Sequence, residues 1–451
     1  MLSKRFFFLS PYPAIYKIIS NFLYVSASLN VQKIIKSPKI LYLYLVSCIL
    51  YLLPLQISAQ GKIVRTYYDE NETRLREEYE VSLGDTGWEK NGYYKNFYRS
   101  GRLALEGNFK ANLRNDWFRE YYDTLVMGKS PVKSQVFFAN GRKNGLMVIF
   151  SVKGDTLQKV NFRNDTIIGM LYSYHPNGKL FRQGNFVEGQ LQGIVKEYYE
   201  TGVLHKEINF VNGQPQGKAK IYYPSGNLHF EENYANGLQE GEQKEFYDLP
   251  SSPIMLQFTM KNNVKEGKEI LYNTNGKVMM ESFYSLGKLN GSVKRWNEAG
   301  ELLYEATYKD GYRVGKEIEY RNQKTAKINI YSNQEVTKKV IEYNDKGEII
   351  FEATYQNGNL EGIVKESKED KDLWIETNYK LGKKEGERKI FQKSSQKLKV
   401  KENYKNNLLN GEYAEYYENG KTKIKGQYKN GKKIGEWYFY DEKGNKQVEK
   451  F

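Results

Sequence analysis

The sequence predicts an all-β fold: an elongated array of about 15–16 antiparallel β-hairpin repeats that form one long twisted sheet. A pattern of glycine and aromatic residues recurs with a period of about 24 residues along most of the 451-residue chain. The composition agrees, because the chain contains 39 Tyr and 39 Gly but only 10 Pro. Aromatic residues favour strands and glycine favours turns, so this composition suits short strands joined by tight turns.

The repeat has a defined register. We number each unit from its opening residue, which is position 1, and count positions 12–24 back from the next unit. Thirteen of fifteen opening residues are Gly, position 6 is aromatic in fourteen of fifteen units, and position 18 is aromatic in thirteen of fourteen. A sixteenth, degenerate unit begins near Lys62. The opening residues are Gly92, Asp116, Gly145, Gly169, Gly193, Gly217, Gly241, Gly267, Gly291, Gly315, Lys338, Gly362, Gly386, Gly411 and Gly435.

Each unit contains two runs of about six or seven strand-forming residues. Asn-Gly at positions 9–10 predicts a two-residue loop between them, which sets position 7 opposite 12 and position 4 opposite 15. Opposite charges that face each other across strands support this register. Five units then pair Lys at position 4 with Glu at position 15: Lys95/Glu106, Lys196/Glu207, Lys220/Glu231, Lys294/Glu305 and Lys365/Glu376.

The same register predicts two unlike faces. Positions 3, 5, 12, 14, 16 and 18 share one face, where small residues at position 16, such as Gly107 and Gly184, make room for rings. We expect the ring at position 18 to face the opening glycine of the next unit. The other face carries positions 4, 6 and 15. Its candidate ligand-facing rings, all at position 6, are Tyr174, Tyr198, Tyr222, Phe246, Tyr272 and Trp296.

The N-terminal sixty residues differ from the array. Residues 39–60 have the basic, apolar and small-residue regions of a signal peptide, with cleavage expected near Ala59/Gln60; uncleaved, they would be a membrane anchor. Cys48 lies in a stretch that looks like a lipidation signal, and the alternative is a cysteine buried in the apolar region. Residues 1–38 form an extension of doubtful status. After them, residues 61–91 are expected to form a degenerate capping repeat and residues 92–451 the main array.

Charge and motifs limit the classes of function. The formal net charge is +15, but residues 61–451 carry 63 basic and 54 acidic side chains, which favours a mixed-charge surface and no nucleic acid partner. The array has no cysteine and no recognisable catalytic motif, and a metal shared by His205 and His229 would need further ligands. We therefore expect no enzyme activity, no cofactor and no metal. Membrane contact is expected only through the N-terminal segment.

With the motif laid out, the repeat resembles the MORN repeat, specifically the bacterial MORN-variant repeat. The best-matching stretch is residues 415–437, and residues 171–193 and 198–217 match nearly as well. The resemblance extends over residues 62–451. It implies a hairpin array used as an interaction surface, and some bacterial members are antitoxins of toxin–antitoxin systems.

These observations lead to one preferred function and two alternatives. The preferred function is a non-enzymatic extracytoplasmic scaffold, periplasmic, surface-bound or secreted, that binds a protein partner. One alternative is a repeat protein that binds carbohydrate in the cell envelope, since rings stacked at position 6 could hold sugar faces. The other is an antitoxin, which requires residence in the cytoplasm.

Overall fold

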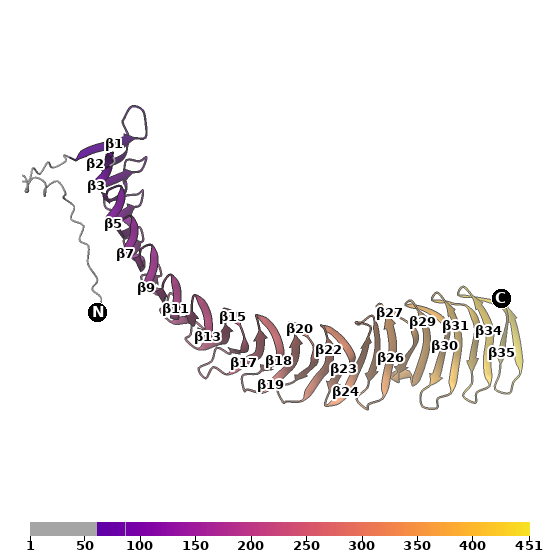
Figure 1. The fold of residues 1–451 in the computed structure, drawn as a ribbon. Coiled ribbons are helices and arrows are strands. Elements are labelled where there is room, and N and C mark those ends of the chain that lie inside the picture. Colours follow the sequence, from indigo (N-terminus) through magenta and orange to yellow (C-terminus); the bar gives the residue numbers. More distant parts are fainter. Residues whose placement is uncertain (1–60, 86) are drawn as a thin grey trace, which may run out of the picture.

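The computed structural model describes residues 61–85 and 87–451. Within these residues, 36 strands form one antiparallel sheet in which each hairpin pairs with the next along the chain. The short strands β15, β20, β27 and β32 each pair with the strand before them, which also pairs with the strand after them. The predicted fold class is confirmed, and the sheet contains sixteen hairpins. Figure 1 shows the hairpins stacked in chain order along an arched array, with β1 and β35 near opposite ends. No helix in the described part of the chain is long and apolar enough to cross a bilayer.

The strands of the first eight hairpins are β1 Lys62–Tyr67, β2 Leu75–Gly84, β3 Gly87–Phe97, β4 Leu103–Lys110, β5 Leu113–Tyr121, β6 Val132–Ala139, β7 Arg142–Phe150, β8 Thr156–Arg163, β9 Thr166–Tyr174, β10 Leu180–Val187, β11 Gln190–Tyr198, β12 Leu204–Val211, β13 Gln214–Tyr222, β14 Leu228–Ala235, β15 Leu238–Gln239, β16 Gly241–Phe246 and β17 Ile254–Lys261.

The remaining strands are β18 Val264–Tyr272, β19 Val278–Ser285, β20 Lys288–Leu289, β21 Gly291–Trp296, β22 Leu302–Lys309, β23 Tyr312–Arg321, β24 Lys324–Ser332, β25 Thr337–Tyr343, β26 Ile349–Gln356, β27 Asn359–Leu360, β28 Gly362–Lys368, β29 Leu373–Lys380, β30 Lys383–Gln392, β31 Leu398–Lys405, β32 Leu408–Leu409, β33 Gly411–Tyr416, β34 Thr422–Lys429, β35 Lys432–Tyr440 and β36 Lys446–Lys450. A 3-10 turn, η2 Glu369–Lys371, follows β28.

The predicted pairing of position 4 with position 15 is confirmed in all five units that motivated it. Lys196 and Glu207 form an ion pair of 3.0 Å, so both side chains lie on the same face. In other units the glutamate at position 15 pairs with a different lysine; Glu231, for example, lies 2.9 Å from Lys218 at position 2. The charges therefore report the register correctly, while the ion pairs themselves vary from unit to unit.

The first turn of the hairpin is a three-residue loop, so the predicted two-residue loop is wrong. In unit 193 the N–H of Tyr199 donates to the C=O of Val203 at 2.9 Å, and the N–H of Gly202 donates to the C=O of Tyr199 at 2.8 Å. This is a type I turn that ends in a left-handed glycine, with φ of 92° at Gly202. The three Asn-Gly turns have the same bonds. The pairing shifts by one residue, so Tyr198 at position 6, and not Tyr199 at position 7, lies opposite Leu204.

The two-residue turn is the second turn of the unit. In unit 193, Val211 lies opposite Gln214, and Asn212 and Gly213 between them have φ of 50° and 77°. Two consecutive left-handed residues make a type I′ turn, which Asn and Gly tolerate best. The N–H of Gly213 also donates to the C=O of Leu191 in the preceding hairpin at 2.9 Å. Because the strands continue up to this turn, most unbroken strands have 8 or 9 residues instead of the predicted six or seven.

A β-bulge occurs at the opening residue of most units. Where β12 meets β13, Ile208 lies opposite Ala219 and Phe210 lies opposite Pro215, so β13 has extra residues between these two pairs. The opening residue Gly217 lies within this bulge and has φ of 77°. A bulge bends its strand and increases the local twist. Repeated bulges therefore allow a single sheet to curve and shield one of its own faces.

The exceptions support this role for the opening residue. Asp116 replaces glycine in one unit and is itself left-handed, with φ of 74°. Lys338 replaces glycine in another, and there the ladder is regular, with Tyr331 directly opposite. Asparagine at position 17 fills the bulge: the side-chain amide of Asn209 donates to the C=O of Gln216 at 3.2 Å. The backbone carbonyl that the bulge removes from the ladder is thus satisfied.

The core lies along one face, at positions 3 and 16, which are opposite each other across the strands. Val293 and Ala306 form such a pair, and both are buried. Ala219 at position 3 is fully buried, and Ile208 lies across the bulged pair from it. We call this surface the core face. Because directly opposed residues share a face, it also carries positions 5, 14 and 18.

Two predictions about the faces need correction. Leu204 at position 12 lies opposite Tyr198 at position 6, which places it on the other face; the bulge at the first turn interrupts the alternation that the prediction assumed. Phe210 at position 18 lies opposite Gly193, the opening residue of its own unit and not of the next. The prediction for position 16 is confirmed at Gly107, where an added Cβ would meet the ring of Phe118.

We call the opposite surface, with positions 2, 4, 6 and 15, the charged face.

A ladder of side-chain hydrogen bonds joins neighbouring hairpins near the first turn. The hydroxyl of Tyr199 at position 7 donates to the C=O of Tyr222 in the next unit at 2.7 Å, and the hydroxyl of Tyr223 donates to the C=O of Phe246 at 2.9 Å. The same bond recurs from Tyr68, Tyr98, Tyr122, Tyr247 and Tyr417.

The left-handed opening glycine predicts a specific loss of stability. An added Cβ at Gly217 would meet no atom within 4 Å, so the cost of Gly217→Ala is backbone strain and not a clash. We expect the free energy of unfolding, measured by urea titration, to fall by about 1–2 kcal/mol. Lys338→Ala is the matched control at the same position without the bulge, and should change stability by less than about 0.5 kcal/mol. Equal losses in the two variants would contradict this account.

Candidate functional site

The predicted ligand-facing rings lie on the charged face, one on each hairpin, and all are half-buried: Tyr174, Tyr198, Tyr222, Phe246, Tyr272 and Trp296. Position 6 contacts the preceding hairpin. The hydroxyl of Tyr320, at the same position, donates to Glu305 at 2.7 Å, and that of Tyr272 donates to Gln257 at 3.3 Å. Burial and the bond to Glu305 raise the pKa of Tyr320 to about 12. These rings therefore help to join the hairpins, and their binding of a ligand stays a prediction.

A second set of ring contacts lies beside the first turn, where tyrosines that the sequence pattern did not indicate stack on the histidines His205 and His229. Each pair joins position 7 to position 13 of one unit. The ring centroids of Tyr199 and His205 are 4.4 Å apart, and those of Tyr223 and His229 are 3.9 Å apart. Burial, with Lys206 nearby, lowers the pKa of His205. In the described residues, no group of three His, Cys, Asp or Glu side chains could hold a metal ion.

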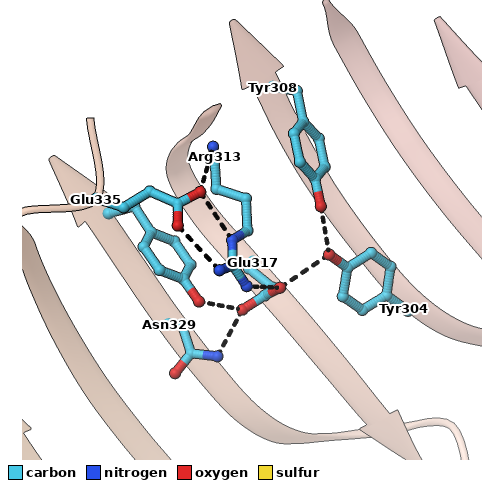
Figure 2. A network of polar contacts seen from close by, with 7 residues as sticks. Tyr304, Tyr308, Arg313, Glu317, Asn329 and Glu335 are labelled. Carbon is cyan, nitrogen blue, oxygen red and sulfur yellow. Dashed lines mark hydrogen bonds and ion pairs between the residues drawn. The ribbon is translucent and has the colours of Figure 1, made fainter. Parts of the chain in front are cut away.

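The most elaborate polar arrangement on the core face surrounds Glu317, as Figure 2 shows. Glu317 is at position 3 of unit 315 and is only 5% exposed. Its carboxylate accepts hydrogen bonds of 2.8 Å from Tyr331, 2.6 Å from Asn329 and 2.8 Å from Tyr304. The guanidinium of Arg313 lies 3.2 Å away. Burial acts to raise the pKa of Glu317, but these bonds outweigh it and hold the pKa below its ordinary value.

Arg313 links this carboxylate to a second one. It forms two side-chain bonds of 3.0 Å to Glu335, and its backbone N–H donates to the same carboxylate at 2.8 Å. The guanidinium also lies over the ring of Tyr331, 4.3 Å from the centroid. The bonds to Glu335 raise the pKa of Arg313. A shallow open pocket of about 320 Å³ lies beside this pair and is lined also by Lys338 and Tyr355.

The arrangement is repeated two units earlier. Glu269, also at position 3, is 4% exposed, forms an ion pair with Lys265, and accepts bonds of 3.3 Å from Ser282 and 3.2 Å from Tyr284. The four residues occupy positions 3, 23, 16 and 18, as in the Glu317 group. The predicted register places position 3 on this face, but it does not predict that a glutamate such as Glu269 is buried there in place of the apolar residue of other units.

The unit between these two groups has an apolar set at the same positions. Val293 at position 3 and Ala306 at position 16 are buried, and Leu289 occupies position 23. The fold therefore accepts either chemistry at this place. The buried charges are a property of particular units and not a requirement of the repeat.

The N-terminal predictions cannot be placed in the structure. Cys48 and the cleavage position near Ala59/Gln60 lie outside the described residues.

Comparison with protein families finds the MORN repeat variant (MORN_2) in six segments. The matched segments are residues 169–188, 191–212, 215–236, 265–285, 289–310 and 409–430. The match is to these six segments, which are similar to the MORN repeat variant. Five of them begin two residues before an opening glycine, and all end at or beside the second turn, so each corresponds to one hairpin. The predicted resemblance is thus confirmed for these six segments. Its extension over the rest of residues 62–451, bacterial origin and antitoxin activity stay predictions.

No curated protein matches the chain. Solved structures that match this chain include the following three. The TcdB2–TccC3–Cdc42 structure is 10% identical, with 87% of this chain and 27% of that chain covered and a TM-score of 0.13. The structure of TcdB2–TccC3 without its hypervariable C-terminal region is 12% identical, with 86% of this chain and 26% of that chain covered and a TM-score of 0.14. A eukaryotic initiation factor is 10% identical, with 87% of this chain and 89% of that chain covered and a TM-score of 0.14. The chain spans about a quarter of the length of the first two proteins.

Unit 291 provides a template for testing the buried network. We expect Glu317→Val alone to lower the free energy of unfolding by about 1–3 kcal/mol, because Asn329, Tyr304 and Tyr331 lose the acceptor of their hydrogen bonds. Arg313 is one-third exposed and keeps its ion pair with Glu335. Adding Arg313→Leu and Asn329→Ala copies the neighbouring set and should return stability, measured by urea titration, to the wild-type value or above it. A triple variant less stable than the wild type would show instead that the network is net stabilising.

The lowered pKa of Glu317 predicts a pH dependence. A carboxylate whose folded pKa is depressed adds stability that is fully present above its unfolded pKa, about 4.3, and is lost as pH falls through the folded pKa. The stability gap between wild type and Glu317→Val should therefore be widest near neutral pH and should narrow below about pH 4. Urea titrations at pH 7, 5 and 3.5 measure it, and a gap that widens on acidification would contradict the prediction.

Proposed function

We propose that this chain is a non-enzymatic scaffold that binds a protein partner along the array, outside the cytoplasm after cleavage near Ala59/Gln60. The observation that carries the proposal is the open sheet itself. It displays the same positions every two strands, about 9.6 Å apart, on two faces of different chemistry. Nearly all contacts of a hairpin are with its two neighbours, so the array can present a long surface without a central core.

The charged face offers exposed apolar anchors for such a partner. Ile194 and Ile363, both at position 2, are 53% and 50% exposed among paired lysines and glutamates. The two isoleucines lie in units 193 and 362, so each offers a separate apolar anchor surrounded by polar side chains. Other units place lysine at position 2, so the two isoleucines are not required by the repeat.

Cross-linking in the producing cells tests the proposal. The tagged full-length chain should recover at least one envelope protein that an equally tagged exported control does not. Ile194→Asp with Ile363→Asp should reduce that recovery several-fold while leaving the circular dichroism spectrum unchanged, because both side chains face solvent. Recovery at the level of the control would count against a protein scaffold.

Location is tested separately. Sequencing the N-terminus of the exported protein should give a start near residue 60. Retention of the intact chain in the cytoplasm would contradict the extracytoplasmic proposal and would favour the antitoxin alternative.

Carbohydrate binding is a second proposal, favoured by the row of rings at position 6. A glycan array probed with the full-length chain should show binding that falls when Tyr198, Tyr222 and Phe246 are changed to Ala. Since these rings are half-buried, an unchanged circular dichroism spectrum is the necessary control. Absence of glycan binding by the wild-type chain would remove this alternative.

A further inference from the structure

The surplus of positive charge is confined to one end of the array. Residues 61–451 carry 63 basic and 54 acidic side chains, and residues 380–451 alone carry 19 and 10. The whole surplus of nine therefore lies in this C-terminal segment, and the rest of the array is balanced. This segment comprises β30 to β36 and the turn that precedes β30.

Part of this charge forms a line along the second-turn edge. Positions 19 and 22 flank the two-residue turn and lie opposite each other. In the last units they are Lys380 opposite Lys383, Lys405 opposite Leu408, and Lys429 opposite Lys432. We call the five lysines the basic edge. All five are exposed, and none has an ion pair with a carboxylate in the described residues.

The basic edge is unfavourable for folding. Like charges directly opposite each other across strands destabilise a sheet. Other units avoid this at the same positions; unit 193, for example, has Val211 opposite Gln214. Because the repeat folds with neutral residues here, its own packing gives no reason for two lysine pairs.

The turn residues add a second local cost. Leu381 occupies position 20, has φ of 49° and is 72% exposed. Most other units have Asn at this place, which tolerates the left-handed conformation better. Leu408, at position 22 beside the next second turn along the array, is 50% exposed. The edge thus combines unpaired lysines with exposed leucines, at positions where backbone strain and solvent both disfavour them.

We propose that the basic edge is the docking site of an acidic, extended segment of a partner protein, which runs across the hairpin ends. This proposal rests on the scaffold function and adds the chemistry of the partner. Successive hairpins place the lysines about 9.6 Å apart, and an extended chain advances about 3.3 Å per residue. A carboxylate at every third residue therefore meets each lysine pair in turn, and apolar side chains between them contact Leu381 and Leu408.

Two glutamates at the basic edge favour a single acidic chain over a broad anionic surface. The backbone N–H groups of Leu381 and Asn406, in the turns themselves, donate to the carboxylates of Glu361 and Glu385 at 2.9 and 2.8 Å. A duplex phosphate backbone or a flat anionic bilayer would bring many negative charges against these two carboxylates. A chain with a carboxylate only at every third residue can avoid them, and its apolar side chains can contact Leu381 and Leu408.

The test uses the full-length chain and a fluorescein-labelled peptide of seven Glu-Gly-Leu repeats, with fluorescence anisotropy at low and physiological salt. We expect salt-sensitive binding that disappears when Gln replaces Glu in the peptide. Changing Lys380, Lys383, Lys429 and Lys432 to Gln should weaken binding about tenfold. The matched control changes Lys196, Lys218, Lys268 and Lys339, all paired with glutamates, to Gln and should change binding less than about twofold.

Leu381→Asn separates binding from folding. It should raise the thermal midpoint of unfolding, because Asn suits the left-handed turn, and at the same time weaken peptide binding about threefold. A lower midpoint, or unchanged binding, would contradict the role assigned to Leu381.

Several outcomes overturn the proposal. Equal loss of binding in the control variant would show that net charge acts at a distance. Tighter binding to single-stranded DNA of equal charge, or to phosphatidylserine vesicles, lost in the same four-lysine variant, would assign the edge to nucleic acid or membrane. If an envelope partner is recovered equally by wild type and the four-lysine variant, the scaffold function is supported and the basic edge is rejected as its docking site.

Discussion

The left-handed residue that opens every unit but the one beginning at Lys338 is the constraint on which most of this structure depends. A flat single sheet cannot bury either face, and this chain supplies no helix or second sheet to cover one in the described residues. The bulge at Gly217 and its equivalents bends the sheet, and positions 3 and 16 are buried within this one layer. The asparagine at position 17, as at Asn209, then satisfies the carbonyl that the bulge exposes. Glycine, asparagine and the buried pair form one linked set.

The parts of the fold that the sequence predicted correctly are those that depend on period and pairing. Lysine at position 4 and glutamate at position 15 identified the register because opposite charges select for facing positions. The first turn was misassigned for a physical reason. Asn-Gly provides the left-handed glycine that both a two-residue and a three-residue loop need, so the dipeptide alone does not fix the loop length. Leu204 was assigned to the wrong face for the same reason, since one inserted residue moves the side chains that follow it to the opposite face.

The tyrosine ladder and the buried carboxylates were beyond the pattern for different reasons. Tyr198 and Tyr199 look alike in the sequence, and only the geometry shows that the second donates to the next hairpin. The repeated Tyr-Tyr pairs at positions 6 and 7 were the available signal. For Glu317 the register predicted the face but not that the carboxylate stays ionised there, which depends on Arg313, Tyr304, Tyr331 and Asn329 converging from three strands. Such convergence belongs to tertiary structure.

The contacts between hairpins also determine where sequence variation can carry functional information. Positions 3, 6, 7, 16 and 18 are occupied by packing and by bonds to the adjacent unit, so their side chains are chosen largely by the fold. At the second turn the inter-hairpin bonds come mainly from backbone groups, such as the N–H of Gly213 and of Gly382, and leave positions 19 and 22 without a structural task. Residues that oppose local stability there, such as Lys380 opposite Lys383, are informative because the repeat neither needs them nor benefits from them. In an array this regular, departures from what folding favours are better indicators of function than the recurring residues.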